Sequence, residues 1–248
     1  DLRLSRGLGD VYKRQTLNLI QSLNKRHIEQ RLGDDELSTR MQAYELAFRM
    51  QAAAPELVDL SKESAYTRSL YGMDRPETQE FGTRCLLARR MLEQGVRFVQ
   101  LYSGDTNGWD AHSDVAKNHG EYCARTDFPV AGLLFDLKQR GLLDDTLVIW
   151  GGEFGRMPMS EQGKGRDHNP WGYSMWLAGG GLRKGIAYGA TDDVGLRATE
   201  KRVSVRNFHA TLLHLLGIDH NELTFFHNGL AQRLTGPDEA EVVEEILA

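Results

Sequence analysis

Asp110 and His112 stand two positions apart in a short loop, residues 107–112, that follows an apolar stretch of the chain. A carboxylate oxygen and an imidazole nitrogen at this spacing can point at one atom, and together they suit Zn²⁺, Mn²⁺ or Fe²⁺. The same pair also fits an ordinary turn in which an aspartate caps the start of a helix. The loop is therefore a candidate metal site, with a purely structural role as the alternative.

Two further loops carry residues of the same types. Glu153 directly follows a predicted buried strand at residues 146–150, where a carboxylate without a partner is costly. Either Arg156 or a metal ion would supply that partner. Asp167 and His168 are neighbours in a glycine-rich loop, and they form another potential pair of ligands or belong to an ordinary solvated loop. Each loop alone is ambiguous, and only their convergence would make a specific site.

Strands are predicted where short apolar runs rich in β-formers occur, and helices where apolar residues recur every three or four positions. The predicted strands cover residues 96–102, 146–150 and 174–178, and the predicted helices cover residues 16–32, 35–53, 78–94, 120–140, 203–216 and 238–248. Pro55 is expected to end the second helix. Because strands and helices alternate, the sequence predicts an α/β fold with a largely parallel sheet.

In a sheet of that kind, ligands bind at the carboxyl ends of the strands. The three polar loops are therefore expected to meet at one edge of the sheet. Carboxylate and imidazole groups gathered there can hold one or two metals, and two-metal sites clamp the attacking and leaving oxygens in phosphoryl or sulfuryl transfer.

The composition excludes several classes of protein. The chain has 248 residues and a formal net charge of −5, so it has no electrostatic reason to bind nucleic acid or an anionic membrane. No apolar run approaches the roughly 18 residues that span a bilayer. Cys85 and Cys123 lie in predicted helices outside any Cys-x-x-Cys motif, and we expect them to be buried thiols rather than nucleophiles.

Longer motifs extend through much of the chain. They are FGTRCLLARRMLEQGVRFVQLY (81–102), GWDAH (108–112), TLVIWGGEFGRMP (146–158), GRDHNPWGYSMWLAGGGLRKG (165–185), VRNFHATLLHLLGI (205–218) and HNGLAQRLTG (227–236). Over nearly all of residues 16–248 the sequence resembles the family called "domain of unknown function 1501". Members of that family look like sulfatase-type proteins of the alkaline-phosphatase superfamily and often carry a twin-arginine export signal.

The resemblance implies a three-layer alkaline-phosphatase-like α/β fold with a mostly parallel sheet, and it assigns the polar residues to one metal site. Asp110 and His112 are similar to a ligand pair of the superfamily. Glu153 stands where the superfamily usually has an aspartate ligand. Asp167 and His168 look like the last members of the set. The implied cofactor is one or two divalent ions of zinc, manganese, iron or calcium.

The implied activity is hydrolysis of phosphate or sulfate esters, with a small-molecule or polysaccharide ester as substrate. Arg156 or Lys164 would hold the anionic group, since a guanidinium offers two parallel donors. In the superfamily the nucleophile comes from the N-terminal half of the domain. Residues 16–248 are therefore expected to be the C-terminal part of one such domain, N-terminally truncated and inactive alone.

Residues 1–15 do not look like the rest of the chain, and we expect them to be a non-native segment outside the fold. By resemblance, the full-length protein is expected to be exported to the periplasm or the cell surface. The alternative to a hydrolase is a non-catalytic exported or cell-surface protein that kept the fold and binds a polysaccharide or a partner.

Overall fold

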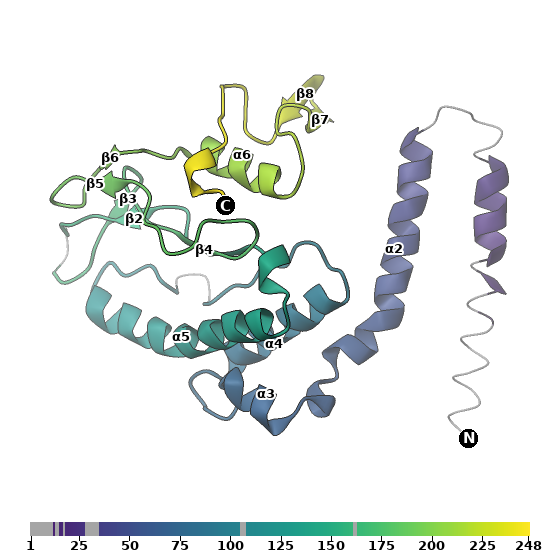
Figure 1. Ribbon diagram of the computed structural model, residues 1–248, viewed down its shortest axis with the longest axis horizontal. Coiled ribbons are helices and arrows are strands. Elements are labelled where there is room, and N and C mark those ends of the chain that lie inside the picture. Colours follow the sequence, from purple (N-terminus) through teal and green to yellow (C-terminus); the bar gives the residue numbers. More distant parts are fainter. Residues whose placement is uncertain (1–11, 13–14, 17, 28–34, 105–107, 161–162) are drawn as a thin grey trace. The chain divides into compact units, whose positions relative to one another are not determined.

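The structure, a computed structural model, describes residues 12, 15–16, 18–27, 35–104, 108–160 and 163–248 (Figure 1). Most of the segment 1–15 thus lies outside the described residues. The chain divides into two compact units, Asp1–Lys62 and Glu63–Ala248.

The described part of the first unit is helical. It contains a helical run at residues 18–27, helix α2 (Asp35–Val58) and the short 3₁₀ segment η1 (Leu60–Lys62). Both helices predicted in this region are confirmed at the described residues. Pro55 does not end the second one, because it lies in the last turn, where its missing N–H removes a single hydrogen bond.

The helices of the second unit are α3 (Ala65–Leu70), α4 (Gln79–Glu93), α5 (Val115–Gln139) and α6 (Val205–Leu215), with 3₁₀ segments η2 (Leu143–Asp145) and η3 (Glu244–Ile246). The predictions at 78–94, 120–140 and 203–216 are confirmed. α5 begins earlier than predicted because the Asp114 side chain accepts a hydrogen bond from the Lys117 N–H and caps the helix. The predicted helix at 238–248 is wrong, since only η3 forms there.

The strands form two-stranded ribbons. β1 (Val148–Trp150) pairs with β4 (Trp176–Ala178), β2 (Gly155–Arg156) with β3 (His168–Asn169), β5 (Ala190–Thr191) with β6 (Ala198–Glu200), and β7 (Thr224–His227) with β8 (Leu230–Arg233). Every strand pair in the described part of the chain is antiparallel. The predicted three-layer alkaline-phosphatase-like α/β fold with a mostly parallel sheet is therefore wrong.

The strand prediction failed in direction more than in position. The two later predicted strands contain β1 and β4, which pair with each other so that Trp150 lies opposite Trp176. Antiparallel strands need no crossover helix between them. Residues 96–102 form no strand among the described residues, and Phe98 and Tyr102 stay 75% and 68% exposed. Strand propensity without a pairing partner and a buried face does not make a strand.

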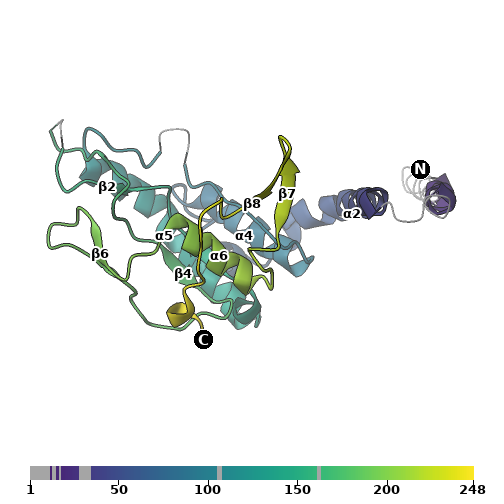
Figure 2. The same cartoon turned by 90° about the horizontal axis from the view of Figure 1, so that it is seen from above.

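Helices α4 and α5 lie side by side and form the core of the second unit (Figures 1 and 2). Burial raises the pKa of the Cys85 thiol to about 12, as suits a structural cysteine. Cys123 is exposed, so the prediction that it is buried is wrong. A Cβ atom at Gly132 would lie 2.2 Å from the Leu70 carbonyl oxygen, so a side chain there would force the backbones apart. The buried apolar residues of these two helices include Cys85, Leu86, Leu133 and Leu137.

A buried arginine links the same helices by charge. Arg89, whose side chain is 3% exposed, lies 2.6 Å from Glu93 and 3.0 Å from Glu63. Its Nε atom lies 3.1 Å from Asp136, to which Tyr71 also donates a hydrogen bond of 2.8 Å. The Glu93 contact has hydrogen-bond geometry, whereas the other two are ion pairs without it. Arg89 thus neutralises carboxylates that are themselves largely withdrawn from water.

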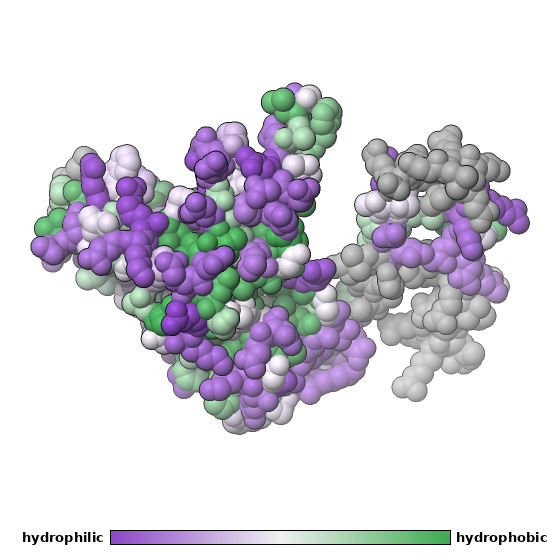
Figure 3. Space-filling view, turned by 45° about the horizontal axis from the view of Figure 1, so that its top comes forward, coloured by the Kyte–Doolittle hydropathy of each residue, from purple (hydrophilic) through white to green (hydrophobic). Residues whose placement is uncertain are grey.

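The surface of the second unit includes exposed apolar side chains (Figure 3). The β7–β8 hairpin projects beyond α6 and carries the exposed Phe225 and Phe226 (Figure 2). Among the described residues, no helix is both long and apolar enough to cross a bilayer, as the sequence predicts.

Candidate metal centre

Two loops that are far apart in the sequence meet at the candidate site. The β2–β3 ribbon places His168 opposite Arg156. The loop before β3 then docks on the loop before α5, where the Arg166 N–H donates a hydrogen bond of 3.0 Å to the Ala111 carbonyl. These backbone contacts bring His168 next to the loop that contains Asp110.

Gly165 allows the two loops to approach this closely. A Cβ atom at this position would lie 1.7 Å from the His112 carbonyl oxygen, so any side chain would push the loops apart. One residue earlier, the Lys164 carbonyl accepts a hydrogen bond of 3.2 Å from the Val115 N–H at the start of α5. The glycine-rich loop is therefore fastened to both the His112 loop and the helix that follows it.

Three of the five predicted ligands converge in this place. The Nε2 atom of His112 lies 3.0 Å from Oδ1 of Asp110 and 3.2 Å from Nε2 of His168. The Nε2 atom of His168 lies 3.1 Å from the same Asp110 oxygen. The three atoms form a nearly equilateral triangle, here called the Asp-His-His triangle. Its side chains are between 37% and 46% exposed.

The size of the Asp-His-His triangle matches a set of metal ligands. Ligand atoms about 2.1 Å from an ion lie about 3.0 Å apart at right angles and about 3.4 Å apart at the tetrahedral angle. The observed separations of 3.0, 3.1 and 3.2 Å fall between these values. One carboxylate oxygen with two imidazole nitrogens suits zinc, iron or manganese better than calcium, which prefers six to eight oxygens.

Asp167 and Arg156 contact the triangle from outside. The Oδ1 atom of Asp167 lies 3.3 Å from Nδ1 of His112, the ring nitrogen that is not part of the triangle. The NH1 group of Arg156 lies 2.6 Å from Oδ1 of Asp110 and donates a hydrogen bond of 3.2 Å to the Arg166 carbonyl. Both residues are therefore close to the site without being corners of the triangle.

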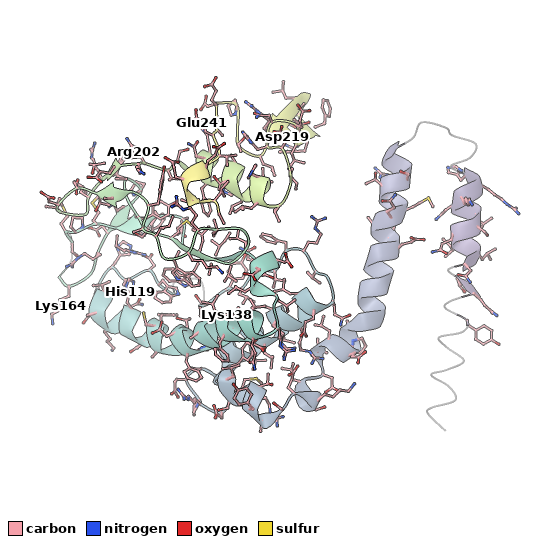
Figure 4. The ribbon with its side chains drawn as sticks, in the orientation of Figure 1. His119, Lys138, Lys164, Arg202, Asp219 and Glu241 are labelled. Atoms are coloured by element: carbon pink, nitrogen blue, oxygen red, sulfur yellow. The ribbon has the colours of Figure 1, made fainter. Side chains whose placement is uncertain are left out.

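Glu153 and Lys164 are not brought into the cluster. Glu153 is exposed and makes no hydrogen bond or ion pair with any described residue. Arg156, the partner that the sequence suggested for it, pairs with Asp110 instead. The Lys164 side chain lies at the outer edge of the second unit (Figure 4). The predicted roles of these two residues in metal and anion binding stay predictions.

The surroundings of Asp110 favour its ionised form. Partial burial raises the pKa of this carboxyl group. The hydrogen bonds from Arg156 and His168 and the charges of Arg156 and His112 lower it by more, so the pKa lies below its ordinary value. Asp110 thus carries a negative charge at neutral pH, which is the state that a cation requires.

Sequence reasoning missed the aromatic residues that support the site. The Phe154 ring lies 4.0 Å, centroid to centroid, from the ring of His168. Trp109 directly precedes Asp110, and its carbonyl accepts a hydrogen bond of 3.2 Å from Nε2 of His119 on α5. The sequence signal was the position of each aromatic residue directly beside a candidate ligand, Trp109 before Asp110 and Phe154 after Glu153.

Almost the whole chain matches the sequence model of one protein family. The family model with the description "Protein of unknown function (DUF1501)" matches residues 1–247. No curated protein and no solved structure matches the chain.

Proposed function

The chain belongs to the DUF1501 family of proteins of unknown function, and from that premise we propose that it is a metal-dependent hydrolase of phosphate or sulfate esters. In this proposal Asp110, His112 and His168 bind one divalent transition metal. The observation that carries it is the Asp-His-His triangle, whose atoms are spaced as metal ligands are. The motifs that resemble sulfatase-type proteins favour the same chemistry.

A divalent ion at such a site supplies Lewis-acid polarisation of an ester oxygen and activation of water. The residues of the chain set its charge. Asp110 contributes one negative charge, and His112 and His168 contribute neutral nitrogens, so a dication would keep a net positive charge. That charge attracts an anionic ester more than a neutral one.

Arg156 is the residue best placed to bind the anionic group of the substrate. Its NH1 group lies 2.6 Å from Asp110, so the guanidinium is beside any ligand of the triangle. The carbonyls of Arg166 and Trp109 hold the same guanidinium at 3.2 and 3.4 Å, which orients it. We therefore expect Arg156 to donate to a phosphate or sulfate oxygen, and we expect Lys164 to add longer-range attraction.

A second candidate function is that of a non-catalytic protein, exported or held at the cell surface, that binds a metal and an anionic polysaccharide. The observation that favours it is the isolation of Glu153, which stands in the place of a superfamily ligand but does not contact the triangle. Three ligands are enough to hold an ion, whereas turnover also requires a nucleophile and a positioned ester.

Elemental analysis of the purified chain tests the metal centre. We would compare the wild type with Asp110→Ala/His168→Ala and with the matched control Asp144→Ala/His214→Ala, whose residues are exposed and outside the triangle. The expected result is about one zinc, iron or manganese ion per chain in the wild type and the control, and none in the triangle variant. Equal metal content in all three proteins would refute the assignment, as would no metal in any of them after reconstitution.

Turnover separates the two candidate functions. The metal-loaded chain would be assayed with 4-nitrophenyl phosphate and 4-nitrophenyl sulfate, and the triangle variant would provide the background rate. Hydrolysis that requires the triangle supports the hydrolase. Stoichiometric metal without hydrolysis of either ester, both in this chain and in a longer family member that has a candidate nucleophile, favours the binding protein.

A further inference from the structure

We infer that Asp167 is a positioning residue, which orients His112 for the metal and is not itself a ligand. This inference rests on the proposed metal centre. It assigns to Asp167 a role different from the one that its residue type and its place beside His168 suggested.

The two ring nitrogens of His112 have different surroundings. Its Nε2 atom faces Oδ1 of Asp110 at 3.0 Å and Nε2 of His168 at 3.2 Å. Its Nδ1 atom lies 3.3 Å from Oδ1 of Asp167. The imidazole ring therefore stands between Asp167 and the other two corners of the triangle.

A metal ion at the triangle would determine which nitrogen of His112 carries the proton. The ion would take the lone pair of Nε2, which faces Asp110 at 3.0 Å, so the ring proton would be on Nδ1, where the Asp167 carboxylate accepts a hydrogen bond from it. The lone pair is then on Nε2, where it points toward the metal position. Histidine ligands of metals commonly donate their other N–H to a carboxylate in this way, and the contact fixes both tautomer and ring orientation.

The backbone around Asp167 makes it suitable for positioning. Its carbonyl accepts a hydrogen bond of 2.8 Å from the Met157 N–H beside the β2–β3 ribbon. Its side chain is 26% exposed, less than either histidine of the triangle. One anchored residue thus connects the segment that presents His168 with the ring of His112.

Titration with Co²⁺ tests this role, because its visible absorption reports the ligand set and its titration curve reports the affinity. The proteins would be the wild type, Asp167→Ala, Asp167→Asn and Asp110→Ala, with Asp193→Ala as a control for loss of an exposed carboxylate. Asp167→Ala should keep the stoichiometry and the absorption bands of the wild type, while its affinity falls about 10–100-fold. Asp167→Asn keeps an oxygen acceptor for Nδ1–H, so it should recover most of the affinity.

Two results would overturn the positioning role while leaving the metal centre intact. Wild-type affinity in Asp167→Ala would show that His112 needs no such support. Changed bands or lost stoichiometry in Asp167→Ala and also in Asp167→Asn, as in Asp110→Ala, would make Asp167 a ligand. Absence of Co²⁺ binding by the wild type would reject the proposed function and this inference with it, and that result is recognised without any variant. Urea unfolding of each variant would show whether it is folded.

Discussion

Arg89→Met should strongly destabilise the second unit, because it leaves buried carboxylates without the cation between them. The side chains of Glu63 and Asp136 are 9% and 5% exposed, so water cannot take the place of the guanidinium. Methionine is also a good helix former and fills part of the same space. The substitution therefore tests the charge of Arg89 more than its volume.

The magnitude follows from what remains around the two carboxylates. Removal of one partner from a buried ion pair costs about 3–5 kcal/mol. Glu63 keeps Arg90 at 2.6 Å, and Asp136 keeps Arg140 at 2.7 Å. These remaining pairs place the expected loss near the lower limit, about 3 kcal/mol.

Arg84→Met is the matched control, since it makes the same change on the same helix. Arg84 is 42% exposed, and its ion pair with Glu80 is open to solvent. Its loss should cost about 1 kcal/mol or less. The two variants together separate the effect of a buried charge from that of an arginine side chain on α4.

Urea unfolding followed by tryptophan fluorescence measures both variants. All four tryptophans belong to the second unit, so the signal reports the unfolding of that unit alone. If Arg89→Met lost no more stability than Arg84→Met, the reasoning about the buried charge network would be wrong.

Three further predictions concern pH, loop docking and a helix cap. Burial raises the pKa of Glu63, but the arginines beside it lower it by more, so it lies below its ordinary value of 4.5. The ionised Glu63 carboxylate should therefore contribute fully to stability above pH 4.5, and this contribution should disappear as the pH falls through the pKa of the folded state. Urea unfolding at a series of pH values measures the change. Gly165→Ala should lower the free energy of unfolding by about 1–3 kcal/mol and weaken Co²⁺ binding, because the added Cβ atom would push the two loops apart. Gly120→Ala is the control: Gly120 has open space around it in α5, so this change should leave Co²⁺ binding unchanged and leave stability equal or raised. Asp114→Ala should cost about 1 kcal/mol in urea unfolding and Asp114→Asn much less, because asparagine also caps helices; equal losses would contradict the cap.

Local signals predicted the helices well, because the features that define them lie close together in the sequence. The helix at 78–94 was predicted from its apolar spacing, and α4 covers Gln79–Glu93. Gly95 follows directly and has a φ of 81°, a conformation that favours glycine at a helix end. Strand direction has no such local signal. A short apolar run such as Val148–Trp150 looks the same whether its partner is parallel or antiparallel. The parallel sheet was predicted from the alternation of strands with helices, and the family resemblance pointed the same way, but neither signal fixes the direction in which two strands pair.

The convergence of Asp110, His112 and His168 was predicted for a reason that does not hold. The residue types and their spacing were sufficient to select them, but they do not meet at the carboxyl edge of a parallel sheet. They meet because Gly165 lets one loop dock on the other and because β2 pairs with β3. Glu153 was selected by the same edge argument, and its exposed position shows where that argument fails.

The two loops that Gly165 joins also determine how a bound ion would affect folding. His112 and His168 are separated by 56 positions in the chain, so the triangle exists only after a long loop has closed. An ion that bridges the two histidines binds the folded chain and not the unfolded chain, so it stabilises the closed loop. Its stabilisation then grows with concentration, to about 2.7 kcal/mol when the free ion is at a hundred times its Kd. The free energy of unfolding of the second unit, measured at increasing ion concentration, therefore reports which ion the triangle binds and how tightly, without any substrate.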